Sequence, residues 1–339
     1  MAMSPSATED RIVESVKRMA GFRPAALRVG IGDDAAVVRP PGAREDWLVT
    51  TDLMLEDVDF RRDWSTPGQL GHKALAVNLS DLAAMGARPL LYFVSLGLPD
   101  GCGAGWIRGF YRGMVPLGDR WGAGLAGGDL SRSDAGILIS LTAIGESAGR
   151  RVLVRSGARP GDLVCVTGTL GRAAAGLFLL DAGCRRGGNE GEREALAAHR
   201  TPQPRCDVGS WLAERRLATA AMDLSDGLST DLGRLTASSG VGAALDASRL
   251  PVFTVSARWG CDPVRLALHG GEDFELLFTV PPRRFVRLSR SYPRKFPPFS
   301  VIGITTQRRR IEWRRDPGAR PQPLEPLGWD HFRPGPVTK

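Results

Sequence analysis

The feature that most constrains this chain is a long apolar segment, Thr66–Pro89, which the pattern predicts to be a single helix. Thr66 is a favourable N-cap, and Pro67 suits the first helical position because that position needs no backbone N–H. Gly86 and Pro89 are the residue types that end a helix. The segment is therefore expected to fold as one helix with defined ends.

Apolar residues recur at helical spacing on two faces of this helix, so it should be largely buried. The stripes are Leu70, Ala74 and Val77, and Leu75, Leu79 and Leu82. One turn beyond the first stripe stands Asp81. An ionised carboxylate on a buried stripe is costly unless it is paired or bound to a metal. Taken alone, the position of Asp81 favours a structural ion pair or a water-filled edge over a metal site, since structural ion pairs also perturb carboxylates.

The chain length and composition predict an α/β protein of two domains. A chain of 339 residues with 42% hydrophobic residues is long enough for two cores. The composition turns to Arg, Gly and Pro around Gly149–Asp162, which is the expected hinge. We therefore expect one domain over residues 1–149 and a second over residues 150–339.

Charge and motif content narrow the function classes. The 45 Lys and Arg residues exceed the 37 Asp and Glu residues, giving a net charge of +8 that suits an anionic substrate. No Walker A, GxGxxG or GxSxG motif occurs. There is no run of twenty apolar residues and no apolar signal-peptide core. Widely spaced cysteines argue against a zinc site and for a reducing cytoplasm: Cys102, Cys165, Cys184, Cys206 and Cys261.

Alternating helical and apolar segments before residue 149 predict a sheet covered by helices. A strand is expected from Asp46 to Thr50, stopping at the polar residues Thr50, Thr51 and Asp52. Further strands are expected at Leu90–Leu98 and Gly136–Gly145, and helices at Glu9–Ala20 and Trp106–Leu117.

Several aspartates share one setting along the chain. Asp34, Asp52, Asp129 and Asp223 each lie beside Gly, Ser or Thr, at a tight turn or at the expected end of an apolar strand. One such acid is ordinarily a turn former or a helix cap. If these acids converge with Asp81, like-charge repulsion requires bound cations, and oxygen ligands select Mg²⁺ or Mn²⁺. Carboxylates holding Mg²⁺ are a common way to bind a nucleoside triphosphate.

Two Gly-Gly turns accompany these acids, at Gly127–Gly128 and Gly270–Gly271. Glycine lets backbone amides approach phosphate oxygens closely, since no Cβ intervenes. The turns agree with a site for a phosphorylated ligand.

An ordered series of motifs resembles the thiamine-monophosphate kinase family, within the ATP-binding superfamily of aminoimidazole ribonucleotide synthetase and selenophosphate synthetase. The resemblance runs from about Gly30 to Phe332. In chain order the motifs are GIGDDAAV, TTD, HKALAVNLSDLAAMGARP, GGD, VRSGARPGD, MDLSDGLSTDL and HGGEDFELLFTV.

The resemblance implies ATP-dependent phosphorylation of thiamine monophosphate to thiamine diphosphate, with several Mg²⁺ ions and ATP as co-substrate. It also implies a homodimer whose N-terminal mixed sheets pair, and a C-terminal α/β sandwich-like domain. The implied metal ligands are Asp34, Thr50, Thr51, Asp52, Asp81, Asp129, Asp223 and Asp226. The implied nucleotide contacts are Tyr111, Gly128, Asp129, Arg155 and Ser225, and the implied thiamine contacts are Asp59, Glu272 and Trp329.

Three positions depart from the family pattern. Leu130 follows GGD where the family often has Thr, so a hydroxyl near the metals is missing. Phe274 replaces the Tyr of GGEDYEL, and His72 replaces a tyrosine often found ahead of KALA.

The chemistry favours direct in-line transfer without a catalytic side chain. The acceptor phosphate is already ionised near neutral pH, so the obstacle is the repulsion between two polyanions, which Mg²⁺ offsets. The histidines are interpreted as structural: His72, His199, His269 and His331. A covalent phospho-aspartate is the alternative route.

Two rival functions remain open on sequence grounds. Another superfamily enzyme is possible, although a selenophosphate synthetase should carry a reactive Cys early in the chain, and the first is Cys102. Basic runs with interleaved aromatics at Arg283–Lys295 and Gln307–Arg320 are the sequence pattern of a nucleic-acid-binding surface. Solvated loop arginines explain the same runs, and no recognition motif accompanies them.

Overall fold

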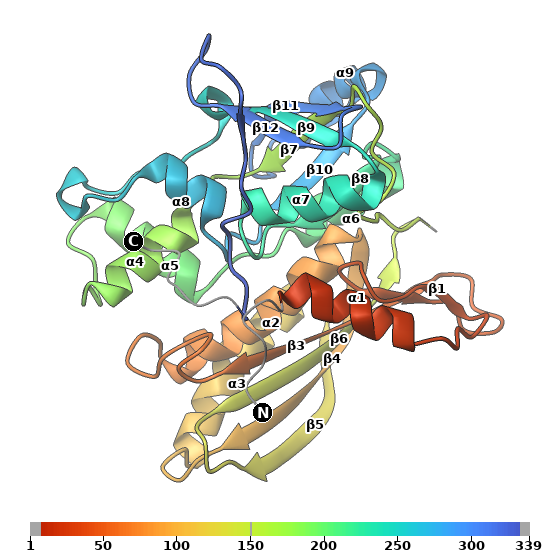
Figure 1. Cartoon of the computed structure of the whole chain (residues 1–339). Coiled ribbons are helices and arrows are strands. Elements are labelled where there is room, and N and C mark those ends of the chain that lie inside the picture. The colour runs from red at the N-terminus through yellow and green to blue at the C-terminus, as the bar shows by residue number, and fades with distance from the viewer. Residues whose placement is uncertain (1–7, 150, 333–339) are drawn as a thin grey trace.

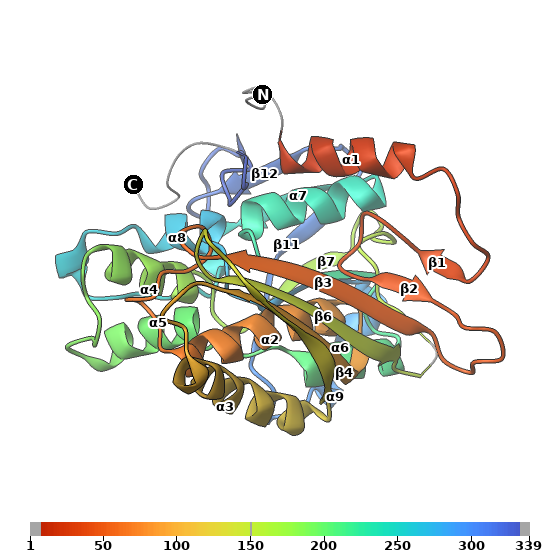
Figure 2. The same cartoon turned by 90° about the horizontal axis from the view of Figure 1, so that it is seen from below.

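Two mixed sheets with helices packed against them build the chain, as the computed structural model shows for residues 8–149 and 151–332 (Figures 1 and 2). The first sheet has six strands in the order β1-β2-β3-β6-β4-β5. Their bounds are β1 Leu27–Val29, β2 Ala36–Val38, β3 Trp47–Leu55, β4 Ala87–Leu98, β5 Gly124–Arg132 and β6 Leu138–Ser147. All neighbours are antiparallel except β4 and β5.

One face of this sheet is covered by helix α2 (Pro67–Ala84), and α3 (Ala104–Trp121) packs against α2. Thr66 accepts from the amide of Gln69 at 3.3 Å while the Gln69 side chain accepts from the amide of Thr66 at 2.9 Å, so a capping box starts α2. The helices approach so closely that a Cβ on Gly113 would lie 1.8 Å from the carbonyl oxygen of Gly68. Glycine is required there.

The second sheet has seven strands in the order β13-β12-β9-β11-β7-β10-β8. Their bounds are β7 Leu163–Thr167, β8 Ala220–Asp223, β9 Gly242–Asp246, β10 Leu276–Val280, β11 Phe299–Thr306, β12 Ile311–Arg314 and β13 Gln322–Pro323. The remaining α-helices are α1 Glu9–Met19, α4 Arg172–Asp181, α5 Glu190–Arg200, α6 Cys206–Arg215, α7 Leu228–Ser239, α8 Pro263–His269 and α9 Pro282–Ser291.

Helix α2 joins the two halves of the molecule. Its sheet-facing side packs on β3, β4 and β6, and other parts of it meet α6 and β8 of the second half. The largest hydrophobic cluster therefore runs from Leu75 and Leu79 on α2 to Leu212 on α6 and Phe278 on β10. Because the middle and end of α2 are packed on both sides, Asp81 on this helix lies between the two sheets.

The structure confirms the expected burial of α2 and corrects the end of that helix and the extent of two strands. Helix α2 ends at Ala84, because β4 begins at Ala87 and pairs Pro89 with Gly145 of β6, where the sequence predicted a helix to Pro89 and a strand from Leu90. The predicted strand Asp46–Thr50 was expected to stop at Thr50–Asp52, but β3 continues to Leu55. Its ladder with β6 runs without interruption from Trp47 to Leu55, so backbone pairing carries the strand through its polar residues. The described part of the chain contains no helix both long and apolar enough to span a lipid bilayer.

Candidate functional site

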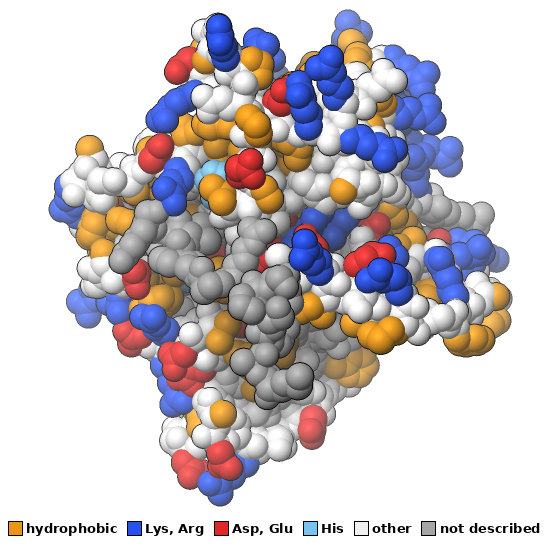
Figure 3. Space-filling view, viewed as in Figure 1, with side chains coloured by type: hydrophobic (Ala, Val, Ile, Leu, Met, Phe, Trp, Pro, Cys, Tyr) orange, Lys and Arg blue, Asp and Glu red, His pale blue; other side chains and the backbone are white. Residues whose placement is uncertain are grey.

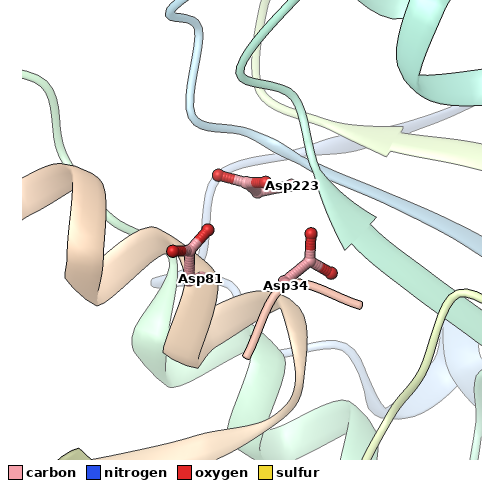
Figure 4. Close-up of side chains that lie close together, drawn as sticks. All are labelled: Asp34, Asp81 and Asp223. Carbon is pink, nitrogen blue, oxygen red and sulfur yellow. The ribbon is translucent and has the colours of Figure 1, made fainter. Parts of the chain in front are cut away.

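Three of the predicted metal ligands converge between the two sheets (Figure 4). Asp34 lies in the turn before β2, Asp81 lies on α2, and Asp223 is the last residue of β8. One carboxylate oxygen from each lies within 4.8 Å of the other two. Residues almost two hundred positions apart in the chain are thus brought to one point.

Each carboxylate of this acidic cluster is held by a hydrogen-bond donor. The Thr50 hydroxyl donates to Asp81 at 2.5 Å, and the Ser80 hydroxyl donates to Asp223 at 2.6 Å. A further donor, the Arg155 guanidinium, contacts Asp34 through Nη2 at 2.5 Å and through Nε at 3.1 Å. These contacts orient the carboxylates, and Arg155 supplies one positive charge against three acids.

Burial and mutual repulsion oppose ionisation in the cluster. Burial, followed by the charges of Asp52, Asp223 and Asp34, raises the pKa of Asp81 well above its ordinary value. Burial and Asp34 raise the pKa of Asp223 to about 7. Burial, with Asp59 and Asp226, raises the pKa of Asp52 to about 6. Like-charge carboxylates in a dry site require cations to ionise together.

The donor set fits a hard divalent cation. Asp34 Oδ2 is buried and has no hydrogen-bond partner among the described residues, although a buried carboxylate oxygen normally has one. The convergent side-chain atoms are carboxylate oxygens, the ligand type that Mg²⁺ prefers. The residues present are therefore suited to Mg²⁺ and unsuited to zinc.

Beside the cluster lies a cavity of about 370 Å³, which we call the substrate cavity. Asp52 lines it and so links it to the cluster. Its lining contains all three predicted thiamine contacts and three residues predicted to bind metal or nucleotide. They are Asp59, Glu272 and Trp329, with Asp52, Ser225 and Asp226.

Backbone hydrogen bonds brace the far wall of this cavity. The Glu272 amide donates to the Ser225 carbonyl at 2.7 Å, and the Trp329 amide donates to the Asp226 carbonyl at 2.9 Å. A Cβ on Gly328 would lie only 2.1 Å from the carbonyl oxygen of Asp226, so glycine is needed for this approach. Three segments far apart in the chain thereby present their side chains to one space.

Glu272 is held by two basic residues. Its carboxylate lies 2.5 Å from Lys73 Nζ and 2.9 Å from His199 Nδ1. Burial alone would raise the pKa of Glu272, but interaction with Lys73 and His199 lowers it to about 2. Glu272 is therefore an anion across the whole neutral range, neutralised by the chain itself.

Two other cavity residues have different local partners. Asp59 Oδ2 accepts from the Leu55 amide at 2.7 Å, while burial raises the pKa of Asp59. The Asp226 carboxylate forms an ion pair with Arg234, so part of its ligating capacity is already used. Within the chain Asp226 is thus an arginine-paired residue at the cavity wall.

Four predicted residues lie outside the cluster and the cavity. Thr51 is on the outer face of the first sheet, where its hydroxyl donates to the Leu141 carbonyl at 3.1 Å. Gly128 and Asp129 lie on the exposed edge strand β5, separated from β3 by β6 and β4. Tyr111, on α3, packs edge-on against Phe110.

Strand spacing sets the distance between these groups. Neighbouring strands lie about 4.8 Å apart, so Asp129 stands roughly 14 Å from β3. The register places it in one row with Leu53 of β3, on the face opposite Asp52. A single chain therefore does not bring Asp129 to the acidic cluster.

Sequence reasoning missed Lys73 and interpreted His199 as structural, yet both line the cavity and contact Glu272. Lys73 had a readable signal, because it lies on the buried helix one turn from Leu70 and is itself buried. His199 had no such signal in the sequence, since only the packing of α5 brings it to the cavity. Ser80 was also missed, although it precedes Asp81 and holds Asp223.

Two family models match the chain. The model described as AIR synthase related protein, N-terminal domain, matches residues 32–147, and the one described as AIR synthase related protein, C-terminal domain, matches residues 159–315.

Curated relatives match nearly the whole chain. The thiamine-monophosphate kinase of Pyrococcus abyssi is 35% identical over 309 residues, covering 91% of this chain and 92% of that protein. The Escherichia coli thiamine-monophosphate kinase is 37% identical over 310 residues, covering 90% and 92%. Among solved structures, AaThiL complexed with AMPPCP and TMP has a TM-score of 0.84 at 31% identity, covering 98% of this chain and 99% of that one.

Proposed function

The chain belongs to the thiamine-monophosphate kinase family, and on that premise we propose that it uses ATP to phosphorylate thiamine monophosphate to thiamine diphosphate. The observation that carries the proposal is that Asp52 lines the substrate cavity and also acts on Asp81 and Asp223 of the acidic cluster. A metal–phosphate site beside an organic pocket is what a kinase for a small phosphorylated substrate requires.

The acidic cluster would hold Mg²⁺ through Asp34, Asp81 and Asp223, with Asp52 and Thr50 beside them. Several bound Mg²⁺ ions would offset the repulsion between ATP and the acceptor phosphate. The chain contributes fixed carboxylate orientation through Ser80 and Thr50, and a guanidinium at Arg155 near the phosphates. Ser225 lies where the cavity meets the loop after β8.

The substrate cavity would hold thiamine monophosphate with its phosphate toward Asp52. The anionic Glu272 faces the cavity and suits the cationic thiazolium or the aminopyrimidine, and Trp329 offers a ring for stacking. Transfer would be direct and in line, because an ionised acceptor phosphate needs no general base. If the enzyme instead became labelled by ATP without acceptor, a phospho-aspartate route would replace this one.

The decisive assay measures ADP release with Mg²⁺ and ATP, with and without thiamine monophosphate, and identifies the product. We expect turnover only with thiamine monophosphate, and none with free thiamine. ATP binding without that turnover would retain the metal site and assign the chain to another acceptor.

Trp329→Ala tests the stacking role within the same assay. We expect the KM for thiamine monophosphate to rise about tenfold, because the lost ring stacking contributes roughly 1–3 kcal/mol of binding free energy. The KM for ATP should be nearly unchanged. An equal rise in both values would assign Trp329 to anchoring the C-terminal segment.

We further propose that the outer face of the first sheet pairs with a second copy of the chain. Leu53 and Phe93 are exposed on that face, and every residue of the edge strand β5 is exposed, including Leu125 and Leu130. An uncovered edge strand with apolar side chains is a typical interaction surface. Thr51 and Asp129 share this face, so both predicted ligands would lie in the interface between the two copies. Sedimentation of wild type against Phe93→Asp should show a dimer and a monomer, respectively.

Domain limits and compartment complete the proposal. A boundary near residue 149 suits the two sheets, which run over residues 27–147 and 163–323. All five cysteines are free thiols, which agrees with a reducing compartment such as the cytoplasm.

A further inference from the structure

A second cavity, of about 490 Å³, lies at the far end of the second sheet. Its walls come from the segment entering β7, from Thr219 just before β8, and from the start of α9. Thr219 and Asp223 stand at opposite ends of β8, about 13 Å apart at 3.3 Å per residue. The cavity is therefore separate from the acidic cluster. We call it the arginine cavity, after Arg151, Arg159, Arg283 and Arg284.

The charge of this cavity is strongly one-sided. Four arginines line it against a single carboxylate, Asp162. That carboxylate is already engaged, because Asp162 Oδ2 accepts from the Thr219 hydroxyl at 2.7 Å and from the Arg159 amide at 3.0 Å. Among the described residues, no carboxylate forms an ion pair with any of the four guanidinium groups. The single charge of Asp162 therefore offsets only part of the positive charge that the four arginines bring to the cavity.

One guanidinium also lacks a hydrogen-bond partner. Arg284 Nη1 is buried and has no acceptor among the described residues. A buried N–H of an ionised group that is left unpaired destabilises the folded protein, so such a group requires an explanation. Burial lowers the pKa of Arg284, and so do the charges of Arg151 and Arg283. An anion in the cavity would remove both penalties at once.

The helix that carries these residues adds to the argument. The first turn of α9 contains Arg283 and Arg284 and no acidic residue. The N-terminus of a helix has a partial positive charge, so cations there are unfavourable and an anion is favoured. At this helix start the effect rests on the dipole, because Pro282 has no N–H and the Arg284 amide donates to the Pro281 carbonyl. Figure 3 shows Lys and Arg side chains gathered over α9, at the upper right of the molecule.

The backbone is shaped to leave this space. Gly157 has φ +116°, and a Cβ there would lie 2.6 Å from the Thr219 carbonyl oxygen. Only glycine lets the 157–162 loop fold against the start of β8 in this conformation. The cavity is thus formed by ordered backbone, and the arginines are presented on its walls.

We propose that the arginine cavity is a second binding site, for a small phosphate-bearing anion, distinct from the kinase site. Guanidinium groups bind phosphate through paired, charge-assisted hydrogen bonds, and the volume is that of a small-molecule site. The cavity is half open to solvent and has room for a small ligand, whereas a nucleic acid backbone would need an extended basic surface. The site lies on the same segment as Arg155, which contacts Asp34, so its occupant would brace the segment that serves the cluster.

The test is calorimetric titration of the whole chain with inorganic pyrophosphate, at fixed ionic strength and with EDTA present. Without divalent metal, binding of phosphates at the acidic cluster is suppressed, so heat of binding reports the arginine cavity. We expect saturable binding that Arg284→Gln and Arg283→Gln each weaken by about tenfold or more, the size of one charge-assisted contact. Arg283 is exposed, so its variant should fold normally even if Arg284→Gln does not.

Arg290→Gln is the matched control, since Arg290 lies on the same helix but outside the cavity. It should change pyrophosphate affinity less than twofold, a difference of about 0.4 kcal/mol. Equal weakening by Arg290→Gln and Arg284→Gln would reduce the site to diffuse surface charge and overturn the proposal. So would the absence of pyrophosphate and orthophosphate binding, or binding of duplex DNA alone.

Discussion

Two groups of carboxylates lie beside the same helix, and their negative charge is balanced in opposite ways. At one end of α2, Lys73 and His199 surround Glu272 and lower its pKa to about 2. Eight residues further, about 12 Å along the helix, Asp81 meets other carboxylates, and its pKa is raised. Glu272 has a counter-charge, Lys73, for its single carboxylate, whereas the cluster has only Arg155 for three acids.

Under the proposed function, this difference would distinguish a residue that recognises the substrate from a site that holds metal. A carboxylate with its own cations is a preformed anion that can orient a ligand without recruiting anything. A carboxylate among carboxylates remains unstable as an anion until a cation arrives from solution. Substitutions that remove charge should therefore have opposite effects on stability at the two places.

The largest effect is expected for Asp81→Asn. Loss of a cluster ligand should lower kcat by about a hundredfold or more, since charge stabilisation at the transferring phosphates is lost. The same change removes like-charge repulsion, so the metal-free protein should unfold at a higher temperature at pH 8. Calorimetry measures the unfolding temperature, and the ADP assay measures kcat.

Asp129→Asn is the control for stability, because Asp129 lies on the exposed strand β5. Its metal-free unfolding temperature should equal that of wild type. An Asp81→Asn protein that fails to fold would instead identify Asp81 as part of a structural ion pair.

Glu272→Gln should have the reverse effect on stability. It leaves Lys73, which is buried, without its counter-charge, so the free energy of unfolding should fall by about 2 kcal/mol in urea titrations. The KM for thiamine monophosphate should rise more than the KM for ATP. Adding Lys73→Met should restore part of the stability, since the uncompensated charge is then gone. A stabilised single variant would contradict the assignment of Glu272 as an internally paired anion.

Mg²⁺ should stabilise the protein more at pH 8 than at pH 5.5. Asp223, with a pKa of about 7, and Asp52, with a pKa of about 6, bind more protons when folded than when unfolded. Metal-free stability therefore falls as pH rises from about 4 to 7, and Mg²⁺, which binds the deprotonated form, compensates for that loss. Thermal unfolding with and without MgCl₂ measures the effect. An equal Mg²⁺ shift at both pH values would place the metal elsewhere.

The smallest effect concerns Glu272 in acid. Its pKa is lowered from 4.5 to about 2, so its stabilising contribution is complete above pH 4.5 and is lost as pH falls toward 2. The stability difference between wild type and Glu272→Gln should therefore be constant from pH 5 to 7 and shrink below pH 4.5. Urea midpoints across this range measure it, and a difference that grows on acidification would reverse the argument.

Sequence patterning predicted α2 almost completely, including its N-cap, its burial and the exceptional position of Asp81. These features are local, since capping and helical spacing act over a few residues. The same reasoning ended β3 too early at Thr50, because a strand's length depends on its partner, β6. The polarity of neighbouring residues does not predict how far a strand pairs with its partner.

For the site, the sequence by itself determined which residues are candidates, and the tertiary structure decided which of them meet. Asp34, Asp81 and Asp223 converge because α2 is buried between two sheets. Asp129 also lies in a motif that predicted a metal ligand, but strand order places it three strands from β3. Residue type and spacing encode local chemistry, whereas convergence depends on sheet order and helix packing, which are set by contacts between residues far apart in the chain.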